Sequence, residues 1–453
     1  MNTPIADFVR AYAEKNPARF HMPAHKGCAI LGCEALDITE IDGADDLSAA
    51  HGIIAESERN AASLFGVGHT FYSCEGSTLA IKAMLALAVQ GAKKGTVPTV
   101  LAARNAHRAF VFAAALLDVN VAWLYPKERA HLCECPITPA DLESALRTSE
   151  APVAACYVTS PDYLGNRLDI AGLSAVCKRY GVPLLVDNAH GAYLAFLSPS
   201  EHPIALGATM CCDSAHKTLP ALTGGAYLHI SADAPAIYAQ NARSLLSVFS
   251  STSPSYLILQ SLDLCNAILS SDYPKALAHT IEKLTAVKQR LRENGWTLPD
   301  GEPLKLTLPT RAYGYSGHEL ASYLSEHHIF IEFHDDAYAV LMLSPANTDA
   351  EIEHLCSVLC ALPKKTPLAS LSHPIPTPAS PAMTMRKALL ASKERIPTQA
   401  AIGRVCAIPT LSCPPAIPIV LCGERITGET AALLSLYGMD AVDVVTEDEE
   451  PAK

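Results

Sequence analysis

The sequence predicts an α/β protein with a mostly parallel β-sheet, followed by a smaller α/β region and a separate C-terminal unit. Between residues 75 and 230, short β-rich segments alternate with helical patterns, which is typical of βαβ units. After residue 255, a long helical pattern leads into a second, shorter α/β pattern. Residues 363–381 are rich in Pro and Ser, which indicates a linker. The 453 residues are sufficient for about two or three domains.

Six segments of the first region are expected to be strands: residues 98–102, 119–124, 153–159, 182–187, 209–212 and 225–230. The helices expected between them are residues 77–92, residues 107–117, a helix that begins at Thr138-Pro139, and residues 170–180, which end at Gly181. Because a sheet of this kind binds its ligand at the carboxyl ends of the strands, functional residues are expected just after strands.

The second region is expected to begin with a long helix over residues 256–269 and 275–294. Strands near 304–308, 329–333 and 339–343 and a helix over 349–362 complete the small α/β region. The last unit is expected to hold a helix at 385–391, a buried strand at 417–421 and a solvated acidic tail at 447–450.

Composition excludes several classes of protein. The formal net charge is −12 and no run of Lys or Arg exceeds two residues, so nucleic-acid binding is not expected. Apolar stretches fall short of the ~18 residues of a membrane span, and the N-terminus lacks the pattern of an export signal. A cytoplasmic protein is therefore expected. Charged residues make up only 18% of the chain against a typical ~25%, which favours surface buried between subunits.

The 15 cysteines are scattered through apolar stretches. In a chain without an export signal they are expected to stay reduced. Cys211-Cys212 and Cys133-Glu134-Cys135 lack a second half with zinc-site spacing, so no metal site is expected.

The most suggestive lysine, Lys217, follows the expected strand at 209–212 in the sequence Asp-Ser-Ala-His-Lys. Desolvation at a strand end favours the neutral amine, which is the nucleophile that forms a Schiff base. An exposed loop lysine is the simpler alternative. Asp187 ends the expected strand at 182–187, where a buried carboxylate needs a cationic or hydrogen-bonding partner such as a pyridinium nitrogen. Otherwise Asp187 is a turn residue or a metal ligand.

Gly76, Ser77 and Thr78 open the helix expected at 77–92. Free N–H groups, two hydroxyls and the positive end of the helix dipole suit a phosphate, although an ordinary N-cap explains the same residues. His107, at the start of the next helix, is either a ring stacked on a cofactor or a cap. A lysine, a carboxylate, a phosphate cradle and a flat ring are together what pyridoxal phosphate requires.

Taken together, these motifs resemble the fold-type I pyridoxal-phosphate decarboxylases of the ornithine/lysine/arginine group, in particular the short bacterial branch without an N-terminal wing domain. The resemblance covers nearly the whole chain. The resemblance rests on motifs at residues 20–27, 37–47, 214–217, 251–256, 414–418 and 423–424.

The resemblance implies an aspartate aminotransferase-like three-layer sandwich with a small α/β domain and a C-terminal α+β domain. Residues 1–45 would be an N-terminal segment and residues 46–255 the cofactor domain. Residues 256–362 would form the small domain, 363–381 the linker, and 382–453 the C-terminal decarboxylase domain with its acidic tail.

The resemblance also implies roles for single residues. Lys217 would bind the cofactor covalently, beside Ser214 and His216 on the phosphate side. Gly76, Ser77 and Thr78 would hold the phosphate, His107 would stack on the ring and Asp187 would pair with the ring nitrogen. Ala189 and His190 would line the opposite ring face and the O3′ edge. Thr252 would reach the phosphate of the neighbouring subunit's cofactor, which implies a homodimer with shared sites.

The implied reaction is decarboxylation of a basic amino acid, with arginine favoured over lysine or ornithine, as in polyamine biosynthesis. Lys217 or His216 would donate the proton that replaces the carboxylate. Two alternatives stay open, namely an aminotransferase or other lyase that uses the same cofactor, and a catalytically idle binding or scaffold protein. The chain also departs from the family pattern: Asn188 stands where the family usually has Glu, and Ala215 where it has Thr.

Overall fold

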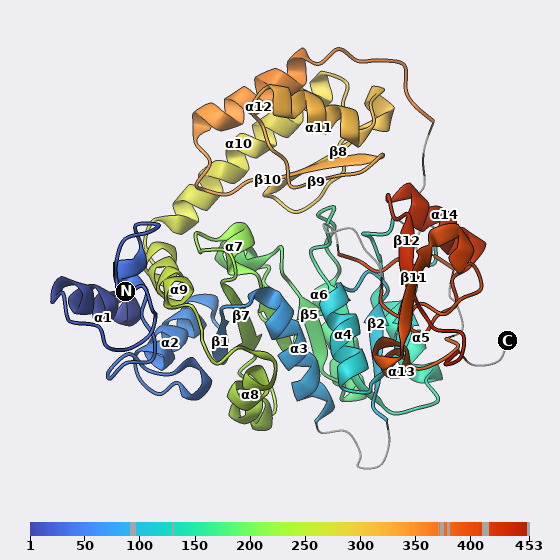
Figure 1. The fold of residues 1–453 in the computed structure, drawn as a ribbon. Helices are drawn as coiled ribbons and strands as arrows, with labels where there is room; N and C mark the ends of the chain where they lie inside the picture. Colours follow the sequence, from blue (N-terminus) through green and yellow to red (C-terminus); the bar gives the residue numbers. More distant parts are fainter. Residues whose placement is uncertain are drawn as a thin grey trace. The chain divides into compact units, whose positions relative to one another are not determined.

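The computed structural model describes residues 1–90, 97–128, 131–369, 371, 376–377, 381–409 and 416–450 (Figure 1). The chain divides into two compact units. The first comprises residues 1–91 and 170–278, and the second comprises residues 92–169 and 279–453. Each unit therefore combines two separate stretches of the sequence. The domain boundaries expected from the sequence stay predictions.

A seven-stranded sheet has the order β1-β7-β6-β5-β4-β2-β3. Its strands are β1 (His69–Ser73), β2 (Thr99–Ala103), β3 (Asn120–Leu124), β4 (Val153–Thr159), β5 (Leu184–Asp187), β6 (Met210–Asp213) and β7 (Ala226–Ile230). The pairs β2–β3, β2–β4 and β5–β6 are parallel, whereas β7 is antiparallel to both β6 and β1. The predicted α/β class with a mostly parallel sheet is thus confirmed.

The helices of the first unit are α1 (Pro4–Glu14), α2 (Ile53–Phe65), α3 (Gly76–Val89), α6 (Ile170–Tyr180), α7 (Ala215–Thr218), α8 (Ala236–Phe249) and α9 (Tyr256–Leu269). Helix α3 is apolar on nearly all sides, and its residues from Leu79 to Ala88 are buried except Lys82. A helix with this pattern belongs in a core rather than at a surface. The sequence predicted α3, α6 and α9, but it gave no prediction for α1, α2, α8 or β1.

In the second unit, α4 (Arg108–Leu116) and α5 (Pro139–Thr148) accompany strands β2, β3 and β4. Thr138 caps α5 by accepting a hydrogen bond from the Asp141 N–H, and the Asp141 carboxylate accepts one from the Thr138 N–H. This reciprocal capping box fixes the start of the helix where the sequence placed it.

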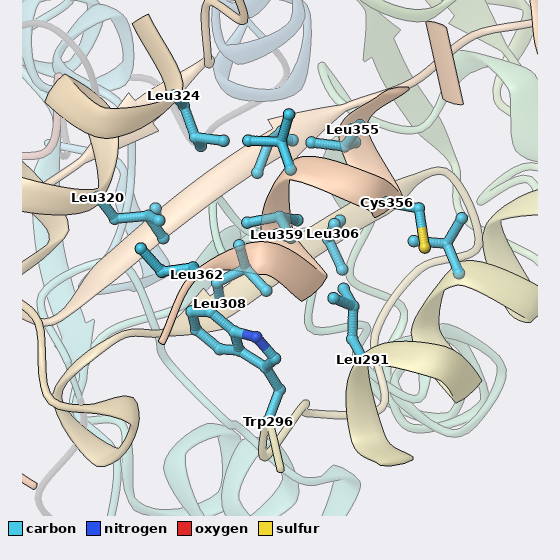
Figure 2. Close-up of a cluster of buried hydrophobic side chains, with 14 of the residues drawn as sticks. Leu291, Trp296, Leu306, Leu308, Leu320, Leu324, Leu355, Cys356, Leu359 and Leu362 are labelled. Carbon is cyan, nitrogen blue, oxygen red and sulfur yellow. The ribbon is translucent and has the colours of Figure 1, made fainter. Parts of the chain in front are cut away.

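A smaller antiparallel sheet of the second unit has the order β8-β10-β9, formed by β8 (Lys305–Pro309), β9 (Phe333–His334) and β10 (Tyr338–Met342). Helices α10 (Tyr273–Glu293), α11 (Gly317–Glu326) and α12 (Asp349–Ala361) lie on one side of it (Figure 1). Their apolar faces enclose a core of leucines around Trp296 (Figure 2). The Trp296 ring stacks on Tyr313 with 3.9 Å between ring centroids. The predicted small α/β region is present, with β9 starting four residues later than expected.

The C-terminal part of the second unit contains α13 (Met385–Leu390), α14 (Gly428–Leu436) and an antiparallel pair of strands, β11 (Lys393–Pro397) and β12 (Ala441–Val445). One expectation for this region was wrong, and a second holds only in part. Residues 417–421 are buried but do not form a strand, because the carbonyls of Pro418 and Ile419 accept hydrogen bonds from the Arg104 side chain. The acidic tail is not wholly solvated, because Glu450 accepts a hydrogen bond from Arg404. Pro414 and Pro415 lie outside the described residues.

Every helix among the described residues is too short or too polar to span a membrane. The cysteines of the described ranges are all free thiols.

Candidate active site

Lys217 and His190 lie together in the first unit. Lys217 is part of the short helix α7, which follows β6, and its Nζ lies 3.0 Å from Nε2 of His190. His190 belongs to the loop after β5 and is buried. Two residues that are 27 positions apart in the sequence therefore meet at the carboxyl ends of neighbouring parallel strands, as the predicted topology requires.

Asp187 ends β5 and is only 2% exposed. Its Oδ1 accepts a hydrogen bond from the Ala189 N–H at 3.2 Å and lies 3.6 Å from Sγ of Cys212. Burial, together with the neighbouring Asp187 carboxylate, raises the pKa of Cys212 well above its usual value, so this thiol remains protonated and can donate its S–H. The loop from Asp187 to His190 is thus anchored next to Lys217.

The start of α3 is suited to an anion. Glu75 is the N-cap residue, but no side chain caps the helix, and the Ser214 hydroxyl donates to Oγ of Ser77 at 2.8 Å. The N–H groups of the first helical turn and the positive end of the helix dipole favour negative charge at this point. Gly76, Ser77 and Ser214 therefore come together as predicted. Thr78 lies in the same turn with an exposed side chain.

The turn before β7 contacts both the start of α3 and helix α7. Gly76 N–H donates to the Gly224 carbonyl at 2.8 Å, and Nδ1 of His216 lies 3.0 Å from the Gly225 carbonyl. Gly224 has φ +98°, and a Cβ there would lie 2.8 Å from the Cys74 carbonyl oxygen. Only glycine fits this position without strain. The turn thus ties the start of α3 to helix α7.

Thr252 lies in an exposed loop between α8 and α9. Its neighbour Ser251 donates a backbone hydrogen bond to Oε1 of Glu75 at 2.6 Å. This bond connects the Thr252 loop to the start of α3 in the same chain. The role of Thr252 toward a neighbouring subunit stays a prediction.

His107 belongs to the second unit, where it caps α4 by accepting a hydrogen bond from Ala109 N–H through Nδ1 at 3.1 Å. The loop that carries it is bound to the C-terminal segment. Arg104 is almost fully buried and donates to the carbonyls of Pro418 at 2.7 Å and Ile419 at 3.1 Å, and Arg108 N–H donates to the Ala416 carbonyl at 2.9 Å. The sequence indicated no link between these two parts of the chain.

Sequence reasoning also missed a fully buried polar cluster that contains Asp213, Asn188, His202 and His229. Asp213 Oδ1 accepts from Nδ2 of Asn188 at 2.7 Å, and Asp213 Oδ2 lies 3.1 Å from Nε2 of His202 and 3.4 Å from Nε2 of His229. Burial raises the pKa of Asp213, but the charges of the two imidazoles and the hydrogen bond with His202 outweigh it and hold the pKa well below its usual value. Asp213 is therefore an ionised carboxylate inside the protein.

Cys211 is next to this cluster, and its Sγ lies 3.7 Å from Nε2 of His202. His202, Cys211 and Asp213 are together a set that could hold a metal ion. In the sequence, Asp213 was noted because it follows an expected strand, and Cys211 was considered as a metal ligand and set aside. Nothing there linked Asp213 to either histidine.

Comparison with known proteins gives the family. Residues 3–307 match the model of the Orn/Lys/Arg decarboxylase major domain, and residues 368–440 match that of the Orn/Lys/Arg decarboxylase C-terminal domain. The chain belongs to the Orn/Lys/Arg decarboxylase family.

Its relatives in this family include the arginine decarboxylase of Halalkalibacterium halodurans, which is 29% identical over 95% of this chain and 92% of that protein. The arginine decarboxylase of Bacillus subtilis is 28% identical over 95% of this chain and 93% of that protein. The crystal structure of the Francisella novicida lysine decarboxylase LdcF matches with a TM-score of 0.80 and 17% identity, over 98% of this chain and 81% of that chain. The predicted fold-type I architecture and the predicted carboxy-lyase family are thereby confirmed.

Orn/Lys/Arg decarboxylases use pyridoxal phosphate, and the first unit contains a donor set that fits this cofactor. An amine for a covalent bond, a buried carboxylate and an uncapped helix start with two hydroxyls occur within one group of strand ends. Lys217, Asp187, Ser77 and Ser214 are the residues that would hold the cofactor. The individual role of each stays a prediction.

Proposed function

We propose that the protein is an arginine decarboxylase that binds pyridoxal phosphate at Lys217. One observation carries this proposal. Lys217, just after β6, lies next to His190, in the loop that follows Asp187 at the end of β5, and the chain belongs to the Orn/Lys/Arg decarboxylase family. The two relatives described above, both named arginine decarboxylase, support arginine over lysine or ornithine.

Bound pyridoxal phosphate would supply an electron sink for the electron pair that remains when the bond from Cα to the carboxylate breaks. Asp187 would hold the proton on the ring nitrogen, Ser77, Thr78 and Ser214 would bind the phosphate, and His107 and Ala189 would face the ring. The carboxylate leaves as carbon dioxide and Cα takes a proton in its place. Lys217 and His216 are the candidate donors, because both lie on α7.

Product analysis tests the reaction directly. Purified protein with added pyridoxal phosphate is incubated separately with arginine, lysine and ornithine, and carbon dioxide, amine and keto acid are measured. Release of carbon dioxide and the corresponding amine from arginine at the highest kcat/KM is expected. A keto acid in place of carbon dioxide would show an aminotransferase, and no product from any amino acid would show a catalytically idle protein.

Covalent labelling tests the site. Borohydride reduction of the cofactor-loaded protein should attach the cofactor to the peptide that contains Lys217. Lys217→Ala should remove both the label and activity, whereas Lys15→Ala, at an exposed position on the protein surface, should retain both. A label on another lysine, or none at all, would refute this assignment.

We further propose a homodimer in which Thr252 reaches the partner subunit's cofactor. The low content of charged residues and the exposure of the Thr252 loop support it. Hybrid dimers with Thr252→Ala in one chain and Lys217→Ala in the other test the idea. One of the two sites in such a hybrid would lack both residues and the other would lack neither, so about half of the wild-type activity per dimer is expected. A hybrid without activity would argue against shared sites.

We also propose a role in polyamine biosynthesis, because the product of arginine decarboxylation would be a basic amine. A cytoplasmic location is a separate proposal. Loss of that amine from cells that lack the gene would support the first. Recovery of the protein in a membrane or extracellular fraction would contradict the second.

A further inference from the structure

Asn188 stands between two predicted site residues, Asp187 and Ala189. It is fully buried, and its backbone N–H donates to the Cys212 carbonyl at 3.0 Å. Its side-chain amide donates to Asp213 Oδ1 at 2.7 Å. Asn188 therefore connects the loop after β5, which carries Asp187 and His190, with the end of β6, which leads to Ser214 and Lys217.

The charge of Asp213 determines what residue 188 can be. Asp213 Oδ2 already faces the ring nitrogens of His202 and His229, and all four side chains of the cluster are shielded from water. A glutamate at position 188 would place a second carboxylate against Asp213 where no solvent can separate the two charges. Two carboxylates in contact cannot both ionise, so one would have to take up a proton or move away.

We propose that Asp213 is a positioning residue of the active site and that Asn188 is the neutral partner that its charge requires. The Asn188–Asp213 hydrogen bond holds the two loops in register, and this register places the Lys217 amine 3.0 Å from the His190 ring. The inference rests on the proposed function for its effect on catalysis, but not for its effect on geometry.

The histidines complete the arrangement. His229 is fixed by Thr70, whose hydroxyl lies 2.9 Å from Nδ1 of the ring. His202 lies on the other side, with its Nε2 3.1 Å from Asp213 Oδ2. Asp213 is thus supported from β7 on one side and from the segment before β6 on the other.

A charge-swap series tests the proposal. Asn188→Asp adds a carboxylate with little change in shape, and we expect kcat to fall about 10- to 100-fold with a smaller change in KM, because the bound geometry is displaced. The visible absorbance spectrum of the bound cofactor should change as well. The double variant Asn188→Asp with Asp213→Asn restores one amide and one carboxylate, and it should recover most of both properties.

Asn266→Asp is the matched control, because Asn266 is another fully buried asparagine and donates to the Ser57 carbonyl and the Tyr72 hydroxyl, away from the strand ends. It should lower the melting temperature but leave the spectrum and kcat of the folded protein unchanged. If Asn188→Asp behaves like this control, or if the double variant folds without recovery, Asp213 has no positioning role. Should Asn188→Asp fail to fold, the double variant alone decides between recovery and failure.

Two further outcomes separate this inference from others. A stoichiometric metal in the purified protein that Asp213→Asn abolishes would show a metal site made of His202, Cys211 and Asp213, and would overturn the positioning role. If the wild-type protein binds pyridoxal phosphate but decarboxylates nothing, the proposed function fails. The absorbance spectra of the variants would then still test the geometric inference.

Discussion

Asp162 is a buried carboxylate in the turn after β4, and its protonation should affect stability. Burial raises its pKa to about 6, although Asn166 donates hydrogen bonds to it from both the backbone and the side chain at 2.9 Å. Unfolding releases this group to its ordinary pKa near 4, so the native state holds a proton that the unfolded state lacks between about pH 4 and pH 6. The free energy of unfolding therefore falls across this range as the pH rises, by about 2–3 kcal/mol from this group.

Asp162→Asn should remove this contribution. As the pH rises from about 4 to 6, the wild type should lose stability through this group and the variant should not. The unfolding free energy of the variant should therefore rise relative to that of the wild type by about 2–3 kcal/mol. Denaturant titrations of both proteins at several pH values measure it. A difference that stays constant with pH would contradict the raised pKa.

Gly224 is the second residue whose replacement has a defined cost. Gly224→Ala should lower stability by at least ~2 kcal/mol, because φ is +98° and the new Cβ would collide with the Cys74 backbone carbonyl. It should also weaken cofactor binding, since the Gly224 carbonyl accepts the hydrogen bond of Gly76. Gly66→Ala is the control, with φ +65° and no atom within 4 Å of the new Cβ. It should cost about 1 kcal/mol without affecting the cofactor.

The sequence predicted those site residues that follow strands, but not those that support them. Lys217 and Asp187 were singled out because strand ends of a parallel sheet converge on one edge, whereas the family resemblance suggested His190. His202 and His229 lie in different segments, and their meeting at Asp213 depends on tertiary packing that no local pattern records. The same holds for Arg104, whose acceptors lie more than 300 residues away in the chain.

Helix α1 shows how an element can depend on one distant side chain. The N–H groups of Ile5 and Ala6 in its first turn donate to Oδ2 of Asp263 at 2.9 and 3.0 Å. Asp263 is fully buried in α9 and also accepts a hydrogen bond from the Ser57 hydroxyl. Its carboxylate therefore joins the start of α1 and the second turn of α2 to α9, and it caps a helix that has no side-chain cap of its own.

Asp263→Ala should release α1, at a cost of about 1–3 kcal/mol for the unsatisfied groups. Hydrogen exchange of residues 4–14 should become much faster, whereas α12, capped by its own Thr348 and Glu351, should be unaffected. Asp263→Asn retains one acceptor and should have a smaller effect. Unchanged exchange in α1 would show that its apolar contacts alone hold it.

Several elements were predictable and others were not, for identifiable reasons. Capping signals placed α5 and α12 within one residue, because a Thr three residues before an acidic residue is a local feature of the sequence. Strand β1 was missed because its residues, His-Thr-Phe-Tyr-Ser, include polar side chains that pack inside, such as Thr70 against His229. The strand expected at 417–421 did not form because its carbonyls serve a side chain rather than a neighbouring strand.

In the molecule as a whole, the C-terminal segment is required to complete the second unit. Deletion of residues 382–453 would remove the carbonyl acceptors of Arg104 and expose apolar side chains such as Val111, which pack against this segment. We expect the shortened chain to be insoluble or to unfold at a much lower temperature. Co-expression of residues 382–453 as a separate polypeptide should restore soluble protein, and a stable shortened chain with wild-type activity would contradict this dependence.

The contact between Arg104 and the carbonyl of Pro418 also has a consequence for the time course of synthesis. The two residues are separated by 314 positions. At the usual rate of about 5–20 residues per second, a ribosome would need about 15 to 60 s after making Arg104 before it made Pro418. Throughout that interval the loop that carries His107 lacks the carbonyl acceptors that fix it. These contacts therefore form only after almost the whole chain has been translated, and a message cut short near its 3′ end yields a chain in which the loop lacks them.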